Sequence, residues 1–410
     1  MIDVHRAREH PEEMRAALAR KGAAALFDEF LALDRTWRLE AARVEQLRAA
    51  TRPKGRPDDE ARRALVAAKA ELRSAEEAFA ATTARRDDLL ARIPNPPDAA
   101  APDGTTDEDA VELRRVGTPP SFEFTPLDHL ALGEFAIDKA AQLSGARFAY
   151  RIGDVAVVEL ALYRYALDRV MAHGFTPVLP PVLVREAAMF GTGFLPTDAA
   201  NLYRVAPDDL YLTGTSEVAL AGLHAGEILE AGSLPRRYTG YSTCFRRESG
   251  AAGKDTRGIF RVHQFDKVEM FVFATPETSD GEHEAILAIE EEIIGGLGIA
   301  YRVVAIAAGD LGPSAAKKYD IEGWIPSQAR YRELTSCSNT TDYQARRLNI
   351  RVRAQGTPRA LHTLNGTAIT ARTLIALLET FQHADGSVDI PEVLVPFGAP
   401  SRIAPRTSST

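Results

Sequence analysis

The chain has 410 residues, enough for two or three domains, and its 45% hydrophobic and 26% charged residues are ordinary for a globular protein. A formal net charge of −8 excludes a protein that binds nucleic acid over its whole surface, so any such contact needs local basic patches. Cys244 and Cys337 are the only cysteines, which excludes a disulfide framework or a cysteine zinc site. Without a membrane-length apolar run or an apolar signal core, the chain is expected to be cytoplasmic, with no membrane partner.

Residues 28–93 are predicted to form an antiparallel helical hairpin. Apolar side chains recur at helical spacing in both halves. The two stripes are Leu33, Trp37, Ala41, Val44 and Leu47, and Leu65, Ala68, Leu72, Ala75, Phe79 and Leu89. Between them, residues 51–58 hold two prolines and a glycine and cannot continue a helix. Two helices bury little surface alone, so the hairpin either mediates packing or dimerisation, or protrudes as an arm toward a long partner.

The Pro-rich sequence from Ile93 to about residue 108 predicts a linker between two domains. The predicted boundaries are 1–97 for the arm, 98–115 for the linker, 116–400 for a second domain and 401–410 for a flexible tail. In the second domain, helices are expected at 160–173, near 216–231, at 282–297 and at 372–382, with strands between them. Because strands and helices do not alternate as βαβ units, the fold class is α+β, with an antiparallel sheet flanked by helices.

The stretch Arg246–Met270 is predicted to be two short strands joined by a basic, Gly-rich loop. Arg246, Arg247 and Glu248 are expected on one strand; Arg261, His263, Phe265 and Glu269 share a face of the other. Such a surface offers guanidinium groups to phosphate, a ring to a base and carboxylates to an ammonium group. An ordinary hairpin with solvated charges is the alternative, but it has no need for several arginines around Gly250, Gly253 and Gly258.

Three further clusters carry polar groups that suit the same chemistry: Thr213–Glu217, Glu333–Asn339 and Asn365–Ala368, the last leading to Arg372. Taken singly, they also fit a helix N-cap, a solvated strand end and a turn. Glu333 and Ser336 together offer oxygen ligands to a hard cation. There is no Walker-type phosphate loop, and a Rossmann site is not supported.

In order and content these clusters resemble the seryl-tRNA synthetases, members of the class II aminoacyl-tRNA synthetases, over nearly the whole chain. Gly174–Pro181 looks like motif 1, which usually builds the dimer interface. Cys244–Glu269 resembles motif 2, and Asn365–Arg372 with the following helix resembles motif 3. Features of the seryl branch are Thr215-Ser216-Glu217, Ser336-Cys337-Ser338-Asn339 with Gln344-Ala345-Arg346-Arg347, and His362-Thr363-Leu364-Asn365.

The resemblance implies a homodimeric, ATP-dependent ligase that forms seryl-adenylate with Mg²⁺ and transfers serine to tRNA(Ser). It implies a serine site made of Thr215, Ser216, Glu217, Glu269, Asn365 and Thr367. The implied ATP site comprises Arg246, Arg247, Glu248, Val262, Phe265, Glu333, Leu334, Thr335, Ser336 and Arg372. Arg246 and Arg372 are the expected catalytic residues, Glu333 and Ser336 the Mg²⁺ ligands, and Arg52, Lys54, Arg56, Arg62 and Arg63 the tRNA contacts. Which carboxylate takes the serine ammonium group and which the hydroxyl stays open.

The chain departs from the family pattern in two places. The arm lacks the usual Arg-Asn-x-x-Ser-Lys segment; about a dozen residues are missing, which shortens each helix by roughly 9 Å. In motif 3, six residues instead of the usual seven separate Asn365 from Arg372. If the missing residue falls in regular structure, Arg372 is expected to miss the γ-phosphate, whereas a loop would absorb the change.

Three function classes follow from these features. The main hypothesis is a serine–tRNA ligase, either a housekeeping enzyme or a specialised paralog for antibiotic self-resistance or biosynthesis. A second is a serine-activating enzyme that loads another acceptor, such as a carrier protein or a small molecule. The third is a non-catalytic regulatory relative. Cys337 lies beside the site, but no partner histidine is evident in the sequence, so a structural role is expected for it.

Overall fold

The computed structural model describes residues 1–52, 58–249, 255, 257–354 and 356–406. The chain divides into two compact units, Met1–Pro96 and Pro97–Thr410. No helix in the described ranges is long and apolar enough to cross a membrane.

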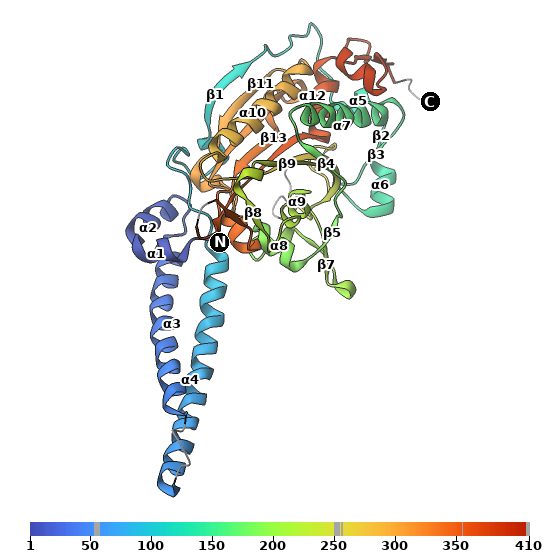
Figure 1. The fold of residues 1–410 in the computed structure, drawn as a ribbon. Coiled ribbons are helices and arrows are strands. Elements are labelled where there is room, and N and C mark those ends of the chain that lie inside the picture. Colours follow the sequence, from blue (N-terminus) through green and yellow to red (C-terminus); the bar gives the residue numbers. More distant parts are fainter. Residues whose placement is uncertain (53–57, 250–254, 256, 355, 407–410) are drawn as a thin grey trace. The chain divides into compact units, whose positions relative to one another are not determined.

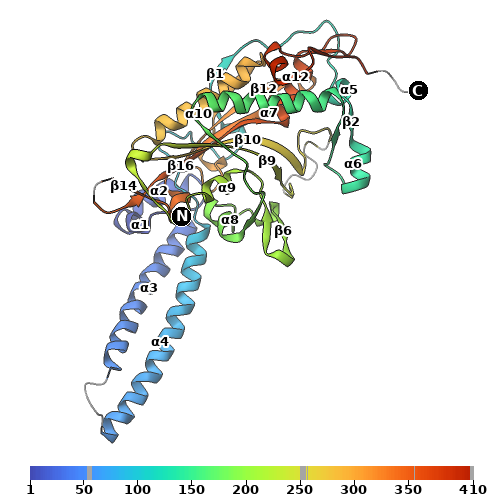
Figure 2. The same cartoon turned by 45° about the vertical axis from the view of Figure 1, so that its right-hand side comes forward.

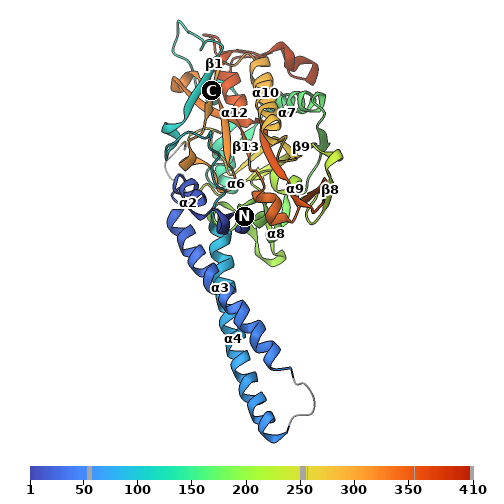
Figure 3. The ribbon, with the colours of Figure 1, turned by 60° about the vertical axis from the view of Figure 1, so that its left-hand side comes forward.

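The first unit consists of helices α1 (Val4–Glu9), α2 (Pro11–Ala19), α3 (Ala24–Ala50) and α4 (Asp59–Arg92). The long helices α3 and α4 run side by side as an antiparallel hairpin (Figures 1 and 3). The predicted hairpin is therefore confirmed, with a first helix that begins earlier than expected. Helices α1 and α2 were not predicted. Asp3 caps α1, because its side chain accepts a hydrogen bond from the backbone N–H of His5 at 2.8 Å.

The apolar stripes of α3 and α4 face each other, and near α1 and α2 they widen into a core. Its fully buried members include Leu18, Phe27, Phe30 and Ile93. The short N-terminal helices therefore supply the buried surface that two helices alone lack. Asp34 of α3 is a charged residue that is buried in the hairpin, where it accepts hydrogen bonds from arginines on α1 and α4.

The second unit is built on an eight-stranded sheet with the strand order β1-β11-β12-β13-β16-β10-β9-β4 (Figure 1). All neighbouring strands are antiparallel except β4 and β9, which are parallel. In sheet order the strands are β1 (Val111–Val116), β11 (Tyr301–Ala305), β12 (Lys317–Ile325), β13 (Arg330–Asn339), β16 (His362–Thr370), β10 (Gln264–Ala274), β9 (Arg236–Phe245) and β4 (Thr176–Val178). The expected α+β class with an antiparallel sheet is confirmed.

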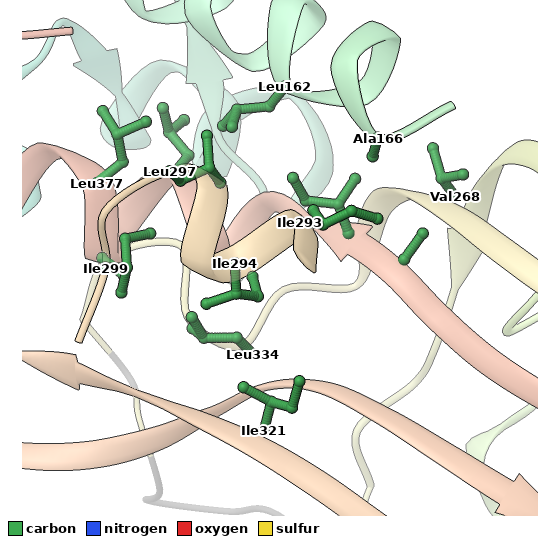
Figure 4. Close-up of a cluster of buried hydrophobic side chains, with 14 of the residues drawn as sticks. Leu162, Ala166, Val268, Ile293, Ile294, Leu297, Ile299, Ile321, Leu334 and Leu377 are labelled. Atoms are coloured by element: carbon green, nitrogen blue, oxygen red, sulfur yellow. The ribbon is translucent and has the colours of Figure 1, made fainter. Parts of the chain in front are cut away.

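Helices α7 (Asp154–Ala172), α10 (Ser279–Gly296) and α12 (Ala371–Thr380) cover one face of this sheet (Figure 2). The main core lies between these helices and the sheet. It includes Leu162 of α7, Ile294 of α10, Leu377 of α12 and Ile321 of β12 (Figure 4). On β10 the alternate residues Val268, Met270 and Val272 belong to this core. Their neighbours therefore point to the opposite face, where the cavity described below lies.

Shorter elements surround the sheet. The remaining helices are α5 (His129–Leu132), α6 (Ile137–Ser144), α8 (Glu186–Thr192), α9 (Glu217–Gly222) and α11 (Tyr343–Leu348). One small sheet has β5 (Leu183–Arg185), β7 (Leu210–Leu212) and β6 (Tyr203–Val205); another has β15 (Arg359–Ala360), β14 (Arg351–Arg353) and β8 (Ile228–Glu230). The two-stranded sheets pair β2 (Phe135–Ala136) with β3 (Tyr150–Arg151), and β17 (Val388–Asp389) with β18 (Arg402–Ile403).

Three local expectations need correction. Within the predicted linker 98–115, residues from Val111 onward form β1, because their backbone pairs with the edge strand β11. The predicted flexible tail includes β18, which is held by pairing with β17 and by burial of Ile403. The helix expected near 216–231 ends at Gly222, and Ile228–Glu230 forms β8 instead.

Candidate active site

A cavity of about 380 Å³ lies on the sheet face opposite α10, between β10, β16, β13 and β12. Strand ends and connecting loops contribute its walls. Predicted site residues that line it are Glu217, Arg246, Glu248, Val262, Phe265, Glu333, Leu334, Ser336, Asn365, Thr367 and Arg372. Segments far apart in the chain therefore supply a single cavity.

Motif 2 differs in local structure from the expectation. Strand β9 ends at Phe245 and β10 begins at Gln264, so Arg246, Glu248 and Arg261 lie in the connection and not on strands. Within the described part of this connection, Arg261 donates a hydrogen bond to Glu248 at 2.6 Å, and Glu248 adopts a left-handed φ of 51°. Gly250 and Gly253 fall outside the described residues.

Arg246 lines the cavity, and its charge lowers the pKa of Glu217 at one end and of Glu333 at the other. Its Nε donates a hydrogen bond to the carbonyl oxygen of Gly214 at 3.2 Å, and its guanidinium carbon lies 5.3 Å from the centre of the Phe265 ring. These contacts fix the side chain while leaving its Nη donors available for a ligand.

One end of the cavity gathers buried carboxylates. Thr215 Oγ1 donates a hydrogen bond to Glu269 at 3.2 Å, and Glu269 also forms an ion pair with Lys267. Glu217 accepts hydrogen bonds from Gln344 Nε2 at 2.7 Å and from Asn365 Nδ2 at 2.9 Å. Within the described part of the chain, Glu217 forms no ion pair.

The environment changes the acidity of both carboxyl groups. Burial raises the pKa of Glu217 to about 7, and the nearby charge of Glu269 adds to that rise. Burial likewise raises the pKa of Glu269, although Lys267 and Thr215 oppose the shift. A ligand ammonium group at this end would stabilise the charged form of Glu217.

The other end of the cavity is cationic and aromatic. Arg372 lies 3.1 Å from the carboxylate of Glu333, and its guanidinium carbon is 4.9 Å from the centre of the Phe260 ring. Although burial alone would raise the pKa of Glu333, the charges of Arg372, Lys318 and Arg246 lower it to about 2. Glu333 is therefore a carboxylate at neutral pH, which suits a metal ligand.

The short spacing in motif 3 still brings Arg372 into the cavity. Strand β16 bulges at Ala368, where its pairing with β10 shifts between Ile369 and Thr367. Thr370 then caps α12, and Arg372 lies in the first turn of that helix, at the cavity wall. The short spacing therefore does not turn Arg372 away from the cavity in this structure.

Five predicted site residues are not part of the cavity wall: Thr215, Ser216, Arg247, Glu269 and Thr335. Thr215 and Glu269 lie behind the wall and are joined by a hydrogen bond. Glu269 also forms an ion pair with Lys267, which is part of the wall. Ser216 Oγ donates a hydrogen bond to the carbonyl oxygen of Gly240 at 3.3 Å.

The other two are directed elsewhere. Arg247 lies 5.9 Å from the Tyr203 ring centre. Thr335 points to the helix-covered face, where its hydroxyl donates to Glu290 at 3.1 Å. Cys337, two residues further along β13, faces the same side as Thr335, whereas Ser336 between them lines the cavity.

Sequence reasoning missed several residues of the cavity. Lys267, Phe260, Lys318 and Ser338 line it, and Gln344 positions Glu217 from behind. Lys267 could have been found, because it shares the spacing of two with Phe265 and Glu269. Lys318 had no local signal, since only the pairing of β12 with β13 places it opposite Ser338.

Cys337 lies on the helix-covered face, fully buried. Burial raises the pKa of its thiol well above the ordinary value, and the carboxyl groups of Glu290 and Asp320 act in the same direction. A thiol of this kind is a poor nucleophile. The geometry thus favours the structural role expected for Cys337.

Of the five predicted tRNA contacts, Arg52, Arg62 and Arg63 are described and exposed, whereas Lys54 and Arg56 lie outside the described residues. Arg62 forms an ion pair with Asp59 at 3.1 Å, and Arg63 donates to the carbonyl oxygen of Asp59 at 3.4 Å. Such exposed contacts are weak and leave the arginines able to exchange partners.

Comparison with known proteins identifies the family. Residues 1–97 match the seryl-tRNA synthetase N-terminal domain, and residues 203–381 match the class II tRNA synthetase core domain (G, H, P, S and T). A serine–tRNA ligase of Thermobifida fusca is 51% identical over 411 residues, which cover 97% of each chain. The chain belongs to the seryl-tRNA synthetase family.

Solved structures agree with this assignment. Seryl-tRNA synthetase from Pyrococcus horikoshii, in complex with ATP, superimposes with a TM-score of 0.92 at 40% identity and covers 99% of this chain and 100% of its own. Prolyl-tRNA synthetase from Giardia lamblia, at 16% identity, has a TM-score of 0.56 over 62% of this chain and 52% of its own. The second likeness shows only the fold that this seryl-tRNA synthetase family member shares with other class II enzymes.

Proposed function

We propose that this seryl-tRNA synthetase family member activates serine with ATP and transfers the seryl group to tRNA(Ser). The observation that carries the proposal is the polarity of the cavity. One end holds a buried carboxylate with a raised pKa, and the other holds arginines and aromatic rings, with Arg246 between them. An amino acid and a nucleotide would meet at Arg246.

In the first step, the carboxylate of serine attacks the α-phosphorus of ATP, and pyrophosphate leaves. The nucleophile comes from the substrate, so the protein contributes orientation and charge stabilisation. Arg246 is suited to both tasks, because its planar fork can bridge the serine carboxylate and an α-phosphate oxygen. Phe265 would stack on adenine, Glu248 and the Val262 backbone would meet the edge of the base, and Arg372 would hold the γ-phosphate.

At the carboxylate end, Glu217 is the residue we propose for the serine ammonium group. Glu269 already has Lys267 and Thr215 as partners, whereas the side chain of Glu217 meets only neutral amide donors within the described residues. Thr367, which lines the cavity, then remains for the serine hydroxyl, with Thr215 and Glu269 directly behind the wall. Alanine would leave those buried groups unpaired, a defect that can give roughly 10⁴-fold discrimination.

Glu333 and Ser336 fit a Mg²⁺ ion. Both line the cavity, and the low pKa of Glu333 keeps it charged. The described residues contain no group of three or more His, Cys, Asp or Glu that could hold a metal. Two protein oxygens completed by phosphate oxygens and water are the usual arrangement for Mg²⁺. The ion would neutralise phosphate charge as it develops.

The acceptor step depends on the N-terminal hairpin in this proposal. Exposed arginines at its far end, Arg52, Arg62 and Arg63 among them, would contact phosphates of tRNA(Ser) and make binding salt-dependent. The enzyme would act in the cytoplasm. Whether it is the housekeeping ligase or a specialised paralog would be decided by testing whether its gene is essential.

We also propose a homodimer that forms through the motif 1 region. Leu179 directly follows β4 and is 86% exposed, and Leu160 of α7, a helix that contacts β4, is 62% exposed. Exposed apolar area of this kind favours a protein partner. Light scattering of the purified chain tests the proposal, and a monomer at micromolar concentration would contradict it.

Two assays run side by side test the reaction. Serine-dependent ATP–pyrophosphate exchange measures activation, and charging of total tRNA with labelled serine measures transfer. Both are expected with wild-type protein. Exchange without charging would indicate another acceptor, such as a carrier protein or a small molecule, and the absence of exchange would indicate a non-catalytic relative.

A further inference from the structure

Lys318 is a cation of the cavity that the proposed reaction has not used. It lies on β12, opposite Ser338, and two residues further Asp320 lies opposite Ser336. Lys318, Ser336 and Ser338 all line the cavity. Because residues two apart on a strand share a face of the sheet, Lys318 lies on the same face as the predicted Mg²⁺ ligand Ser336.

The counter-ion of Lys318 lies beneath it. Lys318 Nζ is 3.0 Å and 3.1 Å from the two carboxylate oxygens of Asp320, whose side chain is only 9% exposed and does not line the cavity. An ammonium group has three donors, and two oxygens of one carboxylate use at most two of them. At least one N–H of Lys318, which lines the cavity, is therefore not used by Asp320.

Lys318 also acts on the phosphate end of the cavity. Although burial favours a neutral amine, the carboxylates of Asp320 and Glu333 raise the pKa of Lys318, so the side chain is charged at neutral pH. Its charge is second only to that of Arg372 among those that lower the pKa of Glu333. Lys318 and Glu333 line the same cavity, at the end where the phosphates beyond the α-phosphate would bind.

We propose that Lys318 is a further ATP-binding residue, which contacts the β- or γ-phosphate and stays in contact with pyrophosphate until it leaves. The inference rests on the adenylate-forming reaction proposed above. Asp320 is the positioning residue, because it holds the flexible stem of Lys318 against the strand. Phosphate would replace water at the open donor, and the Lys318–Asp320 pair would stay intact beneath it.

Binding of two nucleotides separates this role from a structural one. AMP has only the α-phosphate, whereas α,β-methylene-ATP carries all three phosphates and cannot be cleaved to pyrophosphate. For Lys318→Met we expect roughly 10-fold weaker binding of the ATP analogue and AMP affinity within about two-fold of wild type, by isothermal calorimetry. Lys318→Arg should restore most of the analogue affinity, because it keeps the charge.

Two variants control for damage to the fold. Lys317→Met removes the same charge from the neighbouring residue, which faces away and pairs with Glu284 at 3.2 Å, and should bind both nucleotides normally. Lys318→Met with Asp320→Asn removes the lysine without leaving Asp320 unpaired. This double variant should remain defective toward the ATP analogue if the phosphate contact was lost.

The outcomes are distinct. Equal weakening of both nucleotides, normal analogue binding by Lys318→Met, or recovery in the double variant would overturn the role of Lys318. So would a defect confined to transfer from preformed seryl-adenylate to tRNA, which would place Lys318 at the tRNA end instead. A wild-type protein that binds neither nucleotide would contradict the proposed reaction itself.

Discussion

Asp34 in the N-terminal unit and Glu217 in the second unit are both buried carboxyl groups, but the pKa of Asp34 is lowered and that of Glu217 is raised. In the hairpin, Asp34 is 1% exposed, and its oxygens accept hydrogen bonds from Arg8 and Arg86 at 2.8 Å. Burial would raise the pKa of Asp34, but these two arginines lower it overall. In the cavity, the side chain of Glu217 meets only amide donors within the described residues, and burial raises its pKa to about 7.

The presence or absence of a counter-charge distinguishes a carboxylate that stabilises the fold from one that can bind a charged ligand. The charge of Asp34 is balanced within the fold by Arg8 and Arg86, so its removal would take a buried partner from both arginines and destabilise the hairpin. Glu217 is held in place by neutral groups and lacks a counter-charge, which a substrate ammonium group would supply. Changing charges in the hairpin should therefore reduce stability without affecting activation, and changing them in the cavity should do the reverse.

The largest effect is expected for Arg246→Ala. Serine-dependent pyrophosphate exchange should fall about 10³-fold, because the group that bridges the two substrates is lost. Thermal stability should change little, since the side chain of Arg246 makes a single hydrogen bond to the described residues, at Gly214. Arg353→Ala, which removes an exposed arginine 3.3 Å from Glu230, is the matched control. Normal exchange by Arg246→Ala would show that the catalytic assignment is wrong.

Asp34→Ala should have the next largest effect, on stability. Removing one partner of a buried ion cluster costs about 3 kcal/mol, since Arg8 loses its carboxylate partner and Arg86 keeps Asp87 as its one carboxylate partner in the described residues. Urea unfolding of the N-terminal unit should detect the loss, while pyrophosphate exchange should remain normal. The control variant is Asp28→Ala, which breaks the exposed pair of Asp28 with Arg15 at 2.9 Å and should cost little.

The dependence of hairpin stability on pH offers a second test of the role of Asp34. Because the folded state holds Asp34 with a lowered pKa, its stabilising contribution is complete above about pH 4 and is lost as the pH falls through the lowered value. Asp34→Ala should therefore reduce the acid sensitivity of the hairpin. Equal acid sensitivity in the variant and wild type would contradict a structural role for this charge.

Glu217→Gln should have an intermediate effect, on serine binding. The KM for serine should rise roughly 30-fold, because a charge-assisted contact to the ammonium group becomes a neutral one. In wild type, serine binding should strengthen as the pH rises through about 7, where Glu217 loses its proton. The variant should lack that pH dependence, and the KM for ATP should be unchanged.

Glu217→Gln should also change how the stability of the protein depends on pH. A folded carboxyl group with a raised pKa binds a proton that the unfolded group releases, so wild-type stability falls as the pH rises from 4.5 to about 7. Glu217→Gln should remove this decline. A serine KM that is independent of pH in wild type would contradict Glu217 as the partner of the ammonium group.

Sequence patterns predicted these two regions unequally. The hairpin follows from local periodicity, because its stripes lie on single helices. The position of Glu217 beside Asn365 and Gln344 depends on three elements far apart in the chain, and the resemblance to a family supplied what periodicity could not. Neither periodicity nor the family resemblance predicted Lys318, since only strand pairing brings it to the cavity. Helices α1 and α2 were missed because short helices carry few periodic positions.

Cys337→Ala should have the smallest effect and tests the limits of the comparison. Cys337 is buried like Asp34 and adjacent in sequence to Ser336 and Ser338 of the cavity, yet it faces the helix-covered side. Loss of its sulfur should lower the free energy of unfolding by about 1 kcal/mol and leave exchange within about two-fold of wild type. A large loss of exchange at unchanged stability would mean that burial and charge do not suffice to distinguish structural groups from reactive ones in this unit.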